Sequence, residues 1–591
     1  MPDRAGAVPV PDAARTARGG AAPAATPPAG TGRAAIRPAR VTLTAGLLAL
    51  GCAAAFLAAP PLGTDLSAQV ARASFFHRHG AAPVDFGWYG GVSPYGYSPL
   101  TPPLMSWLGP GTLGPRIAGA LALLVAAVAF ALLLVRTAAR RPLPAALLGA
   151  VCIAGNLVSG RVTYAIGVAF GLLALLALTL ARRGPRLATA LPAAVLAGAA
   201  SPVAGLFAGL AGAALVLGAV SRSPAGRRSG QGRAVDGLLL ALAAAVPVAG
   251  LGFGFGAGGW MNISLLDAAR AGTASLAVAL LVPLRPVRAG ALLATLGVAA
   301  ACAVHTPVGL NATRLAAMFT LPVLVGYAPP PAVLARRLGR SGGAWALAAL
   351  LAVLAVWQPP VSVADLRAAG DPTAARGYFR PLLDELRRRG PARVEVVPTA
   401  NYWEAAYVPE AAPLARGWLR QADQAYHRLF LDGSVDADSY AAWLRDNGVG
   451  YVALAGAKPS WVGRREAELV RAGLPYLTPV WRGGDWTLYA VAEPTSIVAG
   501  AELVAADAAG VTFDAPAGAG EVLVRVRWSR WLRLTGPTGP VGPVGVAGSR
   551  AVVRPGCLAP QGEWTTVRVS QPGRYVLSGS LTAAGPFCPD R

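Results

Sequence analysis

The chain has 591 residues, of which 54% are hydrophobic and only 14% charged, with 72 glycines and 51 prolines. That composition excludes a single water-soluble globule and is typical of a membrane protein. Basic residues outnumber acidic ones by 52 to 28, and the excess lies before Pro359, where 27 basic residues stand against 6 acidic ones. Because these charges lie between hydrophobic runs rather than together on one soluble surface, we expect no nucleic-acid partner.

Residues 1–40 consist mainly of Ala, Pro, Gly and Arg without apolar periodicity, which predicts a disordered cytoplasmic tail. Residues 41–62 form an apolar run of about the 20 residues needed to cross a bilayer, and arginines precede it. A cleaved signal peptide is the alternative, but the run is longer than the usual signal core. We therefore expect a first span that leads out of the cytoplasm.

Further apolar runs predict an α-helical polytopic membrane protein with about 11 spans. The later runs lie near 114–135, 144–158, 162–181, 187–200, 203–220, 235–252, 271–284, 289–304, 315–332 and 343–358. Arginines cluster in alternate connections, near residues 136–141, 182–186, 222–233, 285–288 and 336–340. Because cytoplasmic connections collect basic residues, we expect a multi-pass plasma-membrane protein with a cytoplasmic N-terminus and an extracytoplasmic C-terminus.

The composition changes after Pro359 to that of a soluble region, so the membrane domain is expected over residues 41–359, with a long first external loop at 63–113. Residues 360–494 alternate helix-like and strand-like segments and predict an extracytoplasmic α/β domain. Residues 495–591 hold short alternating runs bounded by Gly or Pro, which predict a β-sandwich-like domain. Cys557 and Cys588 lie there, where a disulfide could survive, and we expect that bridge.

Acidic residues are scarce before Pro359, and only Asp65, Asp85 and Asp267 are expected near the outer face. Asp65 stands directly after the first span, in LGTDLSAQV, where a helix is expected to begin. A carboxylate at this edge of the bilayer could act as a general base, and a helix N-cap is an equally weighted alternative. Asp65 and Asp85 are therefore the candidate catalytic residues.

The first external loop is rich in Gly and Pro and carries several aromatic residues. Trp88 and Tyr89, in FGWYGG, could stack on a sugar ring, and His77 could bind sugar hydroxyls. Trp and Tyr also gather at membrane interfaces, and a surface position is the more common one for His77. Because long loops are usually functional or disordered, these three residues are candidates for substrate binding.

Two isolated arginines, Arg161 in NLVSGRVTY and Arg314 in GLNATRLAAM, are expected at outer helix ends. A guanidinium binds phosphate in two-pronged fashion, so either could hold a lipid phosphate, although snorkelling to the headgroups explains them equally well. Asn156 and Tyr164 lie beside Arg161, and Asn311 lies three residues before Arg314. All five are candidate substrate-binding residues. The sequence has no GxxxxGK loop, which excludes a nucleoside triphosphate engine.

The order of these features resembles the GT-C superfamily of membrane glycosyltransferases. The resemblance rests on GTDL directly after the first span, a WYGG turn and a YSPL segment in the first loop, many later spans and an external C-terminal domain. It implies transfer of a sugar from a polyprenyl-phosphate donor to a glycan, lipid or protein acceptor of the cell envelope, with Asp65 as base. Because Asp65 has no acidic neighbour, the chain departs from members with a paired acidic motif, and a divalent ion such as Mg or Mn stays open.

Two other functions fit a polytopic chain. A transporter would show repeated halves and ionisable groups at mid-membrane, whereas the acids here are expected at the edges. A non-catalytic envelope scaffold would leave Asp65 dispensable. The prediction is therefore a glycosyltransferase whose partners are a polyprenyl-phosphate-linked sugar, an envelope acceptor and membrane lipids.

Overall fold

The computed structural model describes residues 38–219, 224–256, 258–330, 336–337, 339–518, 520–538 and 556–589. The tail predicted over residues 1–40 lies outside the described residues, except that its last three residues already belong to helix α1 (Pro38–Ala58). The expected disorder is wrong for those three, because proline is well suited to a first helical turn and the apolar run follows at once.

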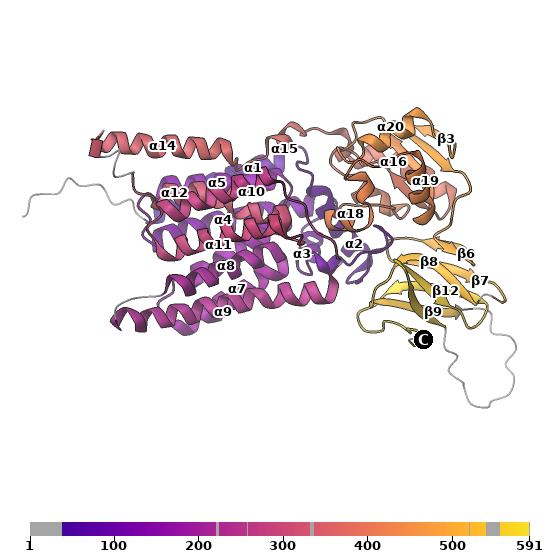
Figure 1. The fold of residues 1–591 in the computed structure, drawn as a ribbon, viewed down its shortest axis with the longest axis horizontal. Coiled ribbons are helices and arrows are strands. Elements are labelled where there is room, and N and C mark those ends of the chain that lie inside the picture. The colour runs from indigo at the N-terminus through magenta and orange to yellow at the C-terminus, as the bar shows by residue number, and fades with distance from the viewer. Residues whose placement is uncertain are drawn as a thin grey trace, which may run out of the picture. The chain divides into compact units, whose positions relative to one another are not determined.

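Each apolar run predicted from the sequence forms a helix, and these helices pack into one bundle (Figure 1). They are α1, α4 (Leu113–Arg136), α5 (Pro142–Val158), α6 (Val162–Ala177), α7 (Arg183–Ala200), α8 (Pro202–Gly218), α9 (Pro224–Phe255), α10 (Leu265–Leu281), α11 (Arg285–Ala303), α12 (Arg314–Tyr327) and α14 (Gly339–Trp357). Within the described residues, 5 segments could cross a membrane by length and composition, namely α1, α4, Gln231–Phe255 of α9, α11 and Gly309–Tyr327. Helices α5, α6 and α8 and the segment Ser341–Trp357 of α14 are apolar but shorter. The count of eleven spans stays a prediction.

Helix α1 shows how such a bundle packs. Its buried stripe repeats every four residues, at Val41, Ala45, Ala49 and Ala53, and lies against α4 and α5. Small residues at this spacing let helix backbones approach closely. The opposite face carries leucines such as Leu43, which is 63% exposed. A continuous row of exposed leucines on an apolar helix of this length is typical of a lipid-facing surface.

The segment between α1 and α4 folds over the end of the bundle. It contains α2 (Leu66–His79), the 3₁₀ turn η1 (Pro94–Gly96) and α3 (Thr101–Trp107). A second 3₁₀ turn, η2 (Gly309–Thr313), leads into α12 at the same end. This end of the bundle also contacts the domain that follows α14, and it is called the domain-side end below.

The α/β domain contains a four-stranded sheet in the order β1-β2-β4-β3, in which β1 and β2 are parallel and the other pairs antiparallel. Its strands are β1 (Arg393–Val396), β2 (Val449–Ala455), β3 (Leu477–Gly483) and β4 (Trp486–Val491). Its helical segments are α15 (Val363–Arg367), η3 (Pro372–Ala374), α16 (Arg376–Arg389), α17 (Glu404–Tyr407), η4 (Val408–Glu410), α18 (Arg420–Tyr426), η5 (Arg428–Phe430), α19 (Ala437–Asp446) and α20 (Arg464–Ala472).

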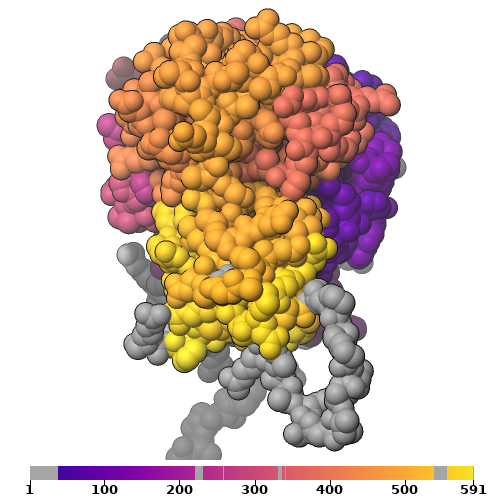
Figure 2. All heavy atoms as spheres, turned by 90° about the vertical axis from the view of Figure 1, so that its right-hand side faces the viewer, coloured from indigo at the N-terminus to yellow at the C-terminus, as the bar shows by residue number. Residues whose placement is uncertain are grey.

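The C-terminal region forms two four-stranded antiparallel sheets, β10-β11-β8-β5 and β6-β7-β12-β9. Alternate residues such as Val522, Val524 and Val526 share one buried core with residues of the other sheet. The strands are β5 (Val498–Ala499), β6 (Glu502–Ala506), β7 (Gly510–Ala515), β8 (Glu521–Arg527), β9 (Leu532–Thr538), β10 (Cys557–Gln561), β11 (Trp564–Arg568) and β12 (Gly573–Gly579). A disulfide joins Cys557 to Cys588, the pair expected from the sequence. The orange α/β domain and the yellow sandwich form one continuous surface in Figure 2.

Candidate active site

A crossing of two backbones brings the start of α2 against the α5–α6 connection. Gly63 has a φ of 82° and Gly160 a φ of 73°, conformations that other residues rarely adopt. A Cβ on Gly63 would lie 2.1 Å from the carbonyl carbon of Ser159, and one on Gly160 would lie 2.4 Å from the nitrogen of Leu66. The Asp65 amide donates to the Ser159 carbonyl at 3.2 Å. Asp65 and Arg161 are therefore neighbours because two glycines allow this contact.

The Asp65 carboxylate faces two guanidiniums. Its Oδ2 lies 3.4 Å from Arg161 Nε and 3.7 Å from Arg314 Nη2. Asp65 occupies the N-cap position of α2, yet its side chain makes no capping hydrogen bond. The N-cap alternative is therefore not what the carboxylate does. At these distances the contacts are loose ion pairs rather than short hydrogen bonds, and the carboxylate stays 21% exposed.

Arg161 is held from behind by its own connection. The Asn156 amide group donates to the Arg161 carbonyl at 3.1 Å, and the Arg161 amide donates to the Asn156 carbonyl at 3.4 Å. The guanidinium keeps 34% of its side chain exposed, and its Nε is buried without a hydrogen-bond partner. Asn156 therefore positions Arg161 by holding its backbone.

Arg314 is the first residue of α12 and is more enclosed, with 15% of its side chain exposed. Its guanidinium lies 5.1 Å from the ring centre of Tyr164, a distance at which the ring face attracts a cation. The Tyr164 hydroxyl is buried, and among the described residues it has no hydrogen-bond partner. Asn311 is buried in η2, one turn before Arg314. The structure thus brings Asp65, both arginines and Tyr164 into one group.

Sequence reasoning missed Arg72. It follows Asp65 by seven residues and Gln69 by three, so all three lie on one face of α2. Its side chain is buried, with the guanidinium 3.6 Å from the ring centre of Tyr97. Burial lowers the pKa of Arg72, while the nearby Tyr97 and Asp65 act to raise it. The spacing of polar residues on a helix outside the apolar runs was the signal that could have found it.

Asp85, the second candidate catalytic residue, stabilises the turn in which it lies. Its Oδ1 accepts from the Gly87 amide at 2.8 Å, and its backbone pairs with Val92 in both directions. The adjoining Val84 and Phe86 belong to the core of the β-sandwich. Burial raises the pKa of Asp85 to about 7. The structure does not pair Asp85 with either arginine of the Asp65 group, and its hydrogen bonds assign it to the turn.

Trp88 and Tyr89 do not offer a ring face to a sugar, because both side chains are buried. Trp88 Nε1 donates to the Ala405 carbonyl at 3.0 Å, and the Tyr89 hydroxyl donates to Asp423 Oδ1 at 3.0 Å. Arg527 Nε donates to the Tyr89 carbonyl at 3.1 Å. The expected sugar-stacking role is replaced by a structural one, in which the WYGG turn ties the α/β domain to the β-sandwich. A local sequence could not show partners more than 300 residues away.

His77 lies in the exposed last turn of α2. It is twelve residues beyond Asp65, which corresponds to about 18 Å along a helix at 1.5 Å per residue. The structure therefore separates His77 from the Asp65 group, as the surface alternative expected.

The residues at Asp65 do not fit a divalent cation. Hard cations take several oxygen ligands, usually with more than one carboxylate, whereas this carboxylate faces two guanidiniums. In the described parts of the chain no group of three or more His, Cys, Asp or Glu side chains could hold a metal ion.

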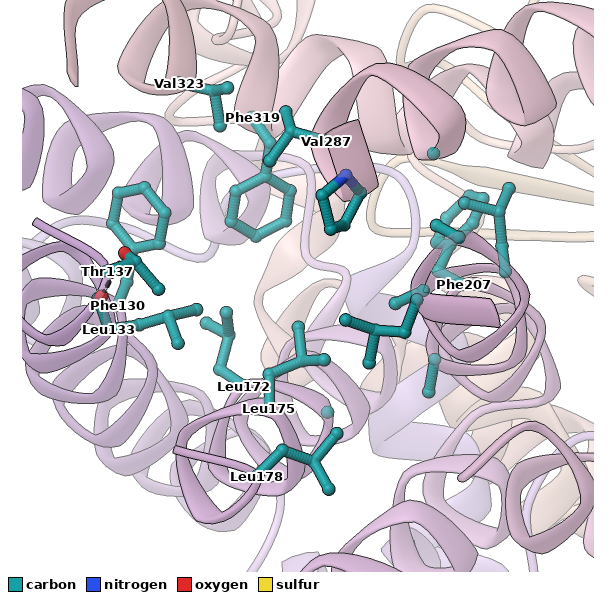
Figure 3. A pocket seen from close by; sticks show the side chains of 18 of the residues that line it. Phe130, Leu133, Thr137, Leu172, Leu175, Leu178, Phe207, Val287, Phe319 and Val323 are labelled. Carbon is teal, nitrogen blue, oxygen red and sulfur yellow. Dashed lines mark hydrogen bonds between the residues drawn. The ribbon is translucent and has the colours of Figure 1, made fainter. Parts of the chain in front are cut away.

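A cavity of about 940 Å³ lies among the helices of the bundle (Figure 3). Its walls are mostly apolar, with Phe130, Leu172, Phe207, Val287 and Phe319 among the residues. The lining also includes four charged residues, namely Arg136, Arg186, Arg233 and Asp236. Tyr164, near the start of α6, lines it too. Because the same ring lies beside Arg314, the domain-side end of the cavity adjoins the Asp65 group.

Comparisons with known proteins give one family and several structures. A family model described as a domain of unknown function (DUF8823) matches residues 499–591. None of the curated proteins compared with the chain matches it. The mycobacterial arabinofuranosyltransferase AftD is 19% identical with a TM-score of 0.43, and the match covers 81% of this chain but 40% of that one. This chain therefore spans about two fifths of the length of AftD.

Two further structures are similar. ArnT from Cupriavidus metallidurans is 14% identical with a TM-score of 0.44, covering 76% of this chain and 97% of that one. The archaeal oligosaccharyltransferase AglB from Archaeoglobus fulgidus is 13% identical with a TM-score of 0.39, covering 77% and 74%. The similarity at these scores is too low to support an activity, so the function is argued from the site itself.

Proposed function

We propose that this chain is a membrane glycosyltransferase that moves a sugar from a polyprenyl-phosphate donor to an acceptor of the cell envelope. One observation supports this most directly. A carboxylate that is free of capping hydrogen bonds lies between two arginines at the domain-side end of an apolar bundle. Such a group supplies a proton acceptor and a binding site for an anion at the same place.

The reaction uses both functions. An acceptor hydroxyl attacks the anomeric carbon of the donor sugar, and its proton passes to Asp65 Oδ2. The bond between the anomeric carbon and the phosphate oxygen breaks, and its electron pair leaves with the polyprenyl phosphate. Arg161 and Arg314 stabilise the negative charge that collects on that phosphate, as fixed cations do for developing anions in other enzymes.

The loose ion pairs of Asp65 allow a donor phosphate to replace the carboxylate at the two guanidiniums. A donor phosphate that binds between the two guanidiniums competes with Asp65 for them, because a phosphate offers more acceptor oxygens and more charge. The carboxylate is then released from its ion pairs and is free to accept a proton. The buried Arg72 keeps one positive charge near α2 while this happens.

The lipid tail of the donor is expected to bind in the cavity of the helix bundle. The wall of this cavity is mostly apolar, and Tyr164 connects it to the guanidinium of Arg314. A polyprenyl chain comes from the bilayer, which is as apolar as the cavity wall, so the tail can enter without meeting water and its affinity depends on van der Waals packing. The Tyr164 hydroxyl, which lacks a partner among the described residues, could donate to the phosphate at the junction of tail and head.

The test is transfer from radiolabelled polyprenyl-phosphate sugars to envelope acceptors by the purified chain. We compare the native chain with Asp65→Asn and with the control Asp267→Asn, whose carboxylate is bonded to Ser264 at the start of α10. Loss of a general base lowers the rate about 10²- to 10⁴-fold. Transfer by Asp65→Asn at the native rate would overturn the proposal.

The same preparation separates the competing functions. A transporter would move substrate into sealed vesicles without forming a covalent product. The proposed orientation requires that protease added outside intact cells cuts the chain after Pro359, and resistance there in intact but not in lysed cells would reverse it.

A further inference from the structure

Two loops of the α/β domain leave the carboxyl ends of the parallel neighbours β1 and β2. They pair with each other through a bridge between Thr399 and Pro459. The first loop carries Tyr402 and the second carries Trp461. The space beyond the carboxyl ends of parallel strands is where ligands of α/β sheets commonly bind. Tyr402, Trp461, Trp418 and Arg420 are together called the aromatic platform below.

The side chains of the aromatic platform converge on one guanidinium. The Arg420 guanidinium carbon lies 5.3 Å from the Trp418 ring centre and 5.2 Å from that of Trp461. Tyr402 stacks on Trp418 with 4.1 Å between ring centres. Trp461 is 52% exposed, whereas Arg420 and Tyr402 are buried. The platform is thus a fixed base with one large indole facing solvent.

The platform contains one strained residue and one enclosed guanidinium. Tyr402 has a φ of 58°, which is unfavourable for a residue with a side chain. Arg420 is 9% exposed, its Nη2 donates to the Tyr402 hydroxyl at 3.3 Å, and its Nη1 lies 3.6 Å from Asp423 Oδ2. Arg420 therefore fixes the positions of the rings around it and leaves the exposed Trp461 indole as the ligand-facing surface.

The platform is anchored on both sides of the Asp65 group. The carbonyl of Asn401, next to Tyr402, accepts from the Ser67 hydroxyl at 2.9 Å, two residues beyond Asp65. Gln421, next to Arg420, donates to the Pro307 carbonyl at 3.1 Å, on the connection that leads to Arg314. Helix α18 accordingly lies at the domain-side end of the bundle (Figure 1).

We propose that the aromatic platform binds a sugar residue of the acceptor glycan and presents the chain to Asp65. The apolar C–H face of a sugar ring stacks on Trp461, because the aromatic face is electron-rich. The identification of the ligand as the acceptor rests on the proposed function, whereas the identification as a saccharide rests on the platform.

The charge balance of the platform selects neutral sugars. Arg420 is compensated by Asp423, which in turn accepts from the Tyr89 hydroxyl. An anion would therefore find little net positive charge at Arg420, in contrast to the two arginines that face Asp65. The donor phosphate is therefore expected to bind at the arginines near Asp65, and the uncharged acceptor sugar at Trp461.

The test is saturation-transfer NMR on the full chain in lipid nanodiscs. The probes are four soluble hexasaccharides, built from glucose, galactose, mannose or arabinose. The variants are Trp461→Ala, Trp461→Phe and the control Trp107→Ala, which removes another exposed indole, on α3. Aromatic stacking corresponds to about a three- to tenfold change in affinity. We expect Trp461→Ala to lower the affinity for the bound hexasaccharide by this factor. Trp461→Phe should keep most of the affinity, and Trp107→Ala should keep all of it.

Two results would overturn the proposal, namely no binding of any of the four probes to the native chain, or unchanged binding in Trp461→Ala. Asp65→Asn is included because it should bind the probe fully while its transfer rate falls about 10²- to 10⁴-fold. If the native chain binds the probe but transfers no sugar, the saccharide site at the aromatic platform is supported and the proposed function is contradicted. If the native and Trp461→Ala chains transfer sugar with the same acceptor KM, the proposed function is supported and the acceptor site at the aromatic platform is contradicted.

Discussion

The bundle holds two groups in which one aspartate meets two arginines, and they differ in how tightly they are closed. At the domain-side end, Asp65 faces its arginines at 3.4 and 3.7 Å and is 21% exposed. At the other end of α6, Asp236 accepts from Arg183 at 3.1 Å and from Arg186 at 2.9 Å, and its side chain is only 6% exposed.

The difference indicates what each group is for. Both oxygens of Asp236 are used in hydrogen bonds, so that group ties α7 to α9 and leaves no acceptor free. The Asp65 group has the same residue types but no short hydrogen bond between carboxylate and guanidinium. The same composition therefore closes a helix contact in one place and leaves room for a ligand in the other.

The largest expected effect comes from neutralising each aspartate in turn. Asp65→Asn should lower transfer about 10²- to 10⁴-fold with little change in Tm, because loose, partly exposed ion pairs contribute little to stability. Asp236→Asn should leave transfer near native and cost about 1–3 kcal/mol of stability, since two arginines lose a well-bonded partner. Transfer assays and thermal unfolding of both variants measure this, and equal loss of transfer in both would erase the distinction.

A second, smaller effect tests the arginines. Arg314→Lys should raise the donor KM about tenfold, because lysine keeps the charge but loses the two-pronged contact with phosphate. Arg161→Lys should act in the same direction more weakly, since Arg161 is the more exposed of the two. Arg183→Lys is the matched control at the other end of α6, because Arg183 also pairs with an aspartate, Asp236, and does not line the cavity. A donor KM that rises equally in the control would argue against a phosphate site at Asp65.

The helices were predictable because each apolar run is long enough to form one, whatever its partners. The positions of Asp65, Arg161 and Arg314 at helix ends were also predictable, because charges are expelled from the apolar runs. Their convergence on one carboxylate was not, since it depends on the contact that Gly63 and Gly160 permit. Neither glycine stands out in a chain that contains 72 of them.

The first external loop shows that residue type alone can also suggest a binding role that the structure does not bear out. Trp88 and Tyr89 look like a sugar-binding pair in sequence, yet their partners are Ala405 and Asp423 in the α/β domain. The residues of the aromatic platform are spread over three loops, and sequence analysis did not select any of them. Chemistry can be read from a residue type, but exposure depends on packing between distant segments.

The smallest expected effect concerns Asp85, whose pKa is raised by burial. Its pKa is raised from its ordinary value to about 7, so the folded chain holds a proton there that the unfolded chain has lost above about pH 4. Stability from this group is therefore fully present at low pH and is lost as the pH rises through 7. Because Asp85 is partly exposed, we expect a loss of about 1–2 kcal/mol between pH 5 and pH 8. Asp85→Asn keeps an acceptor for the Gly87 amide without a titrating group, so it should flatten the pH dependence of Tm while transfer persists. A pH dependence identical to that of the native chain would show that the turn does not depend on this proton.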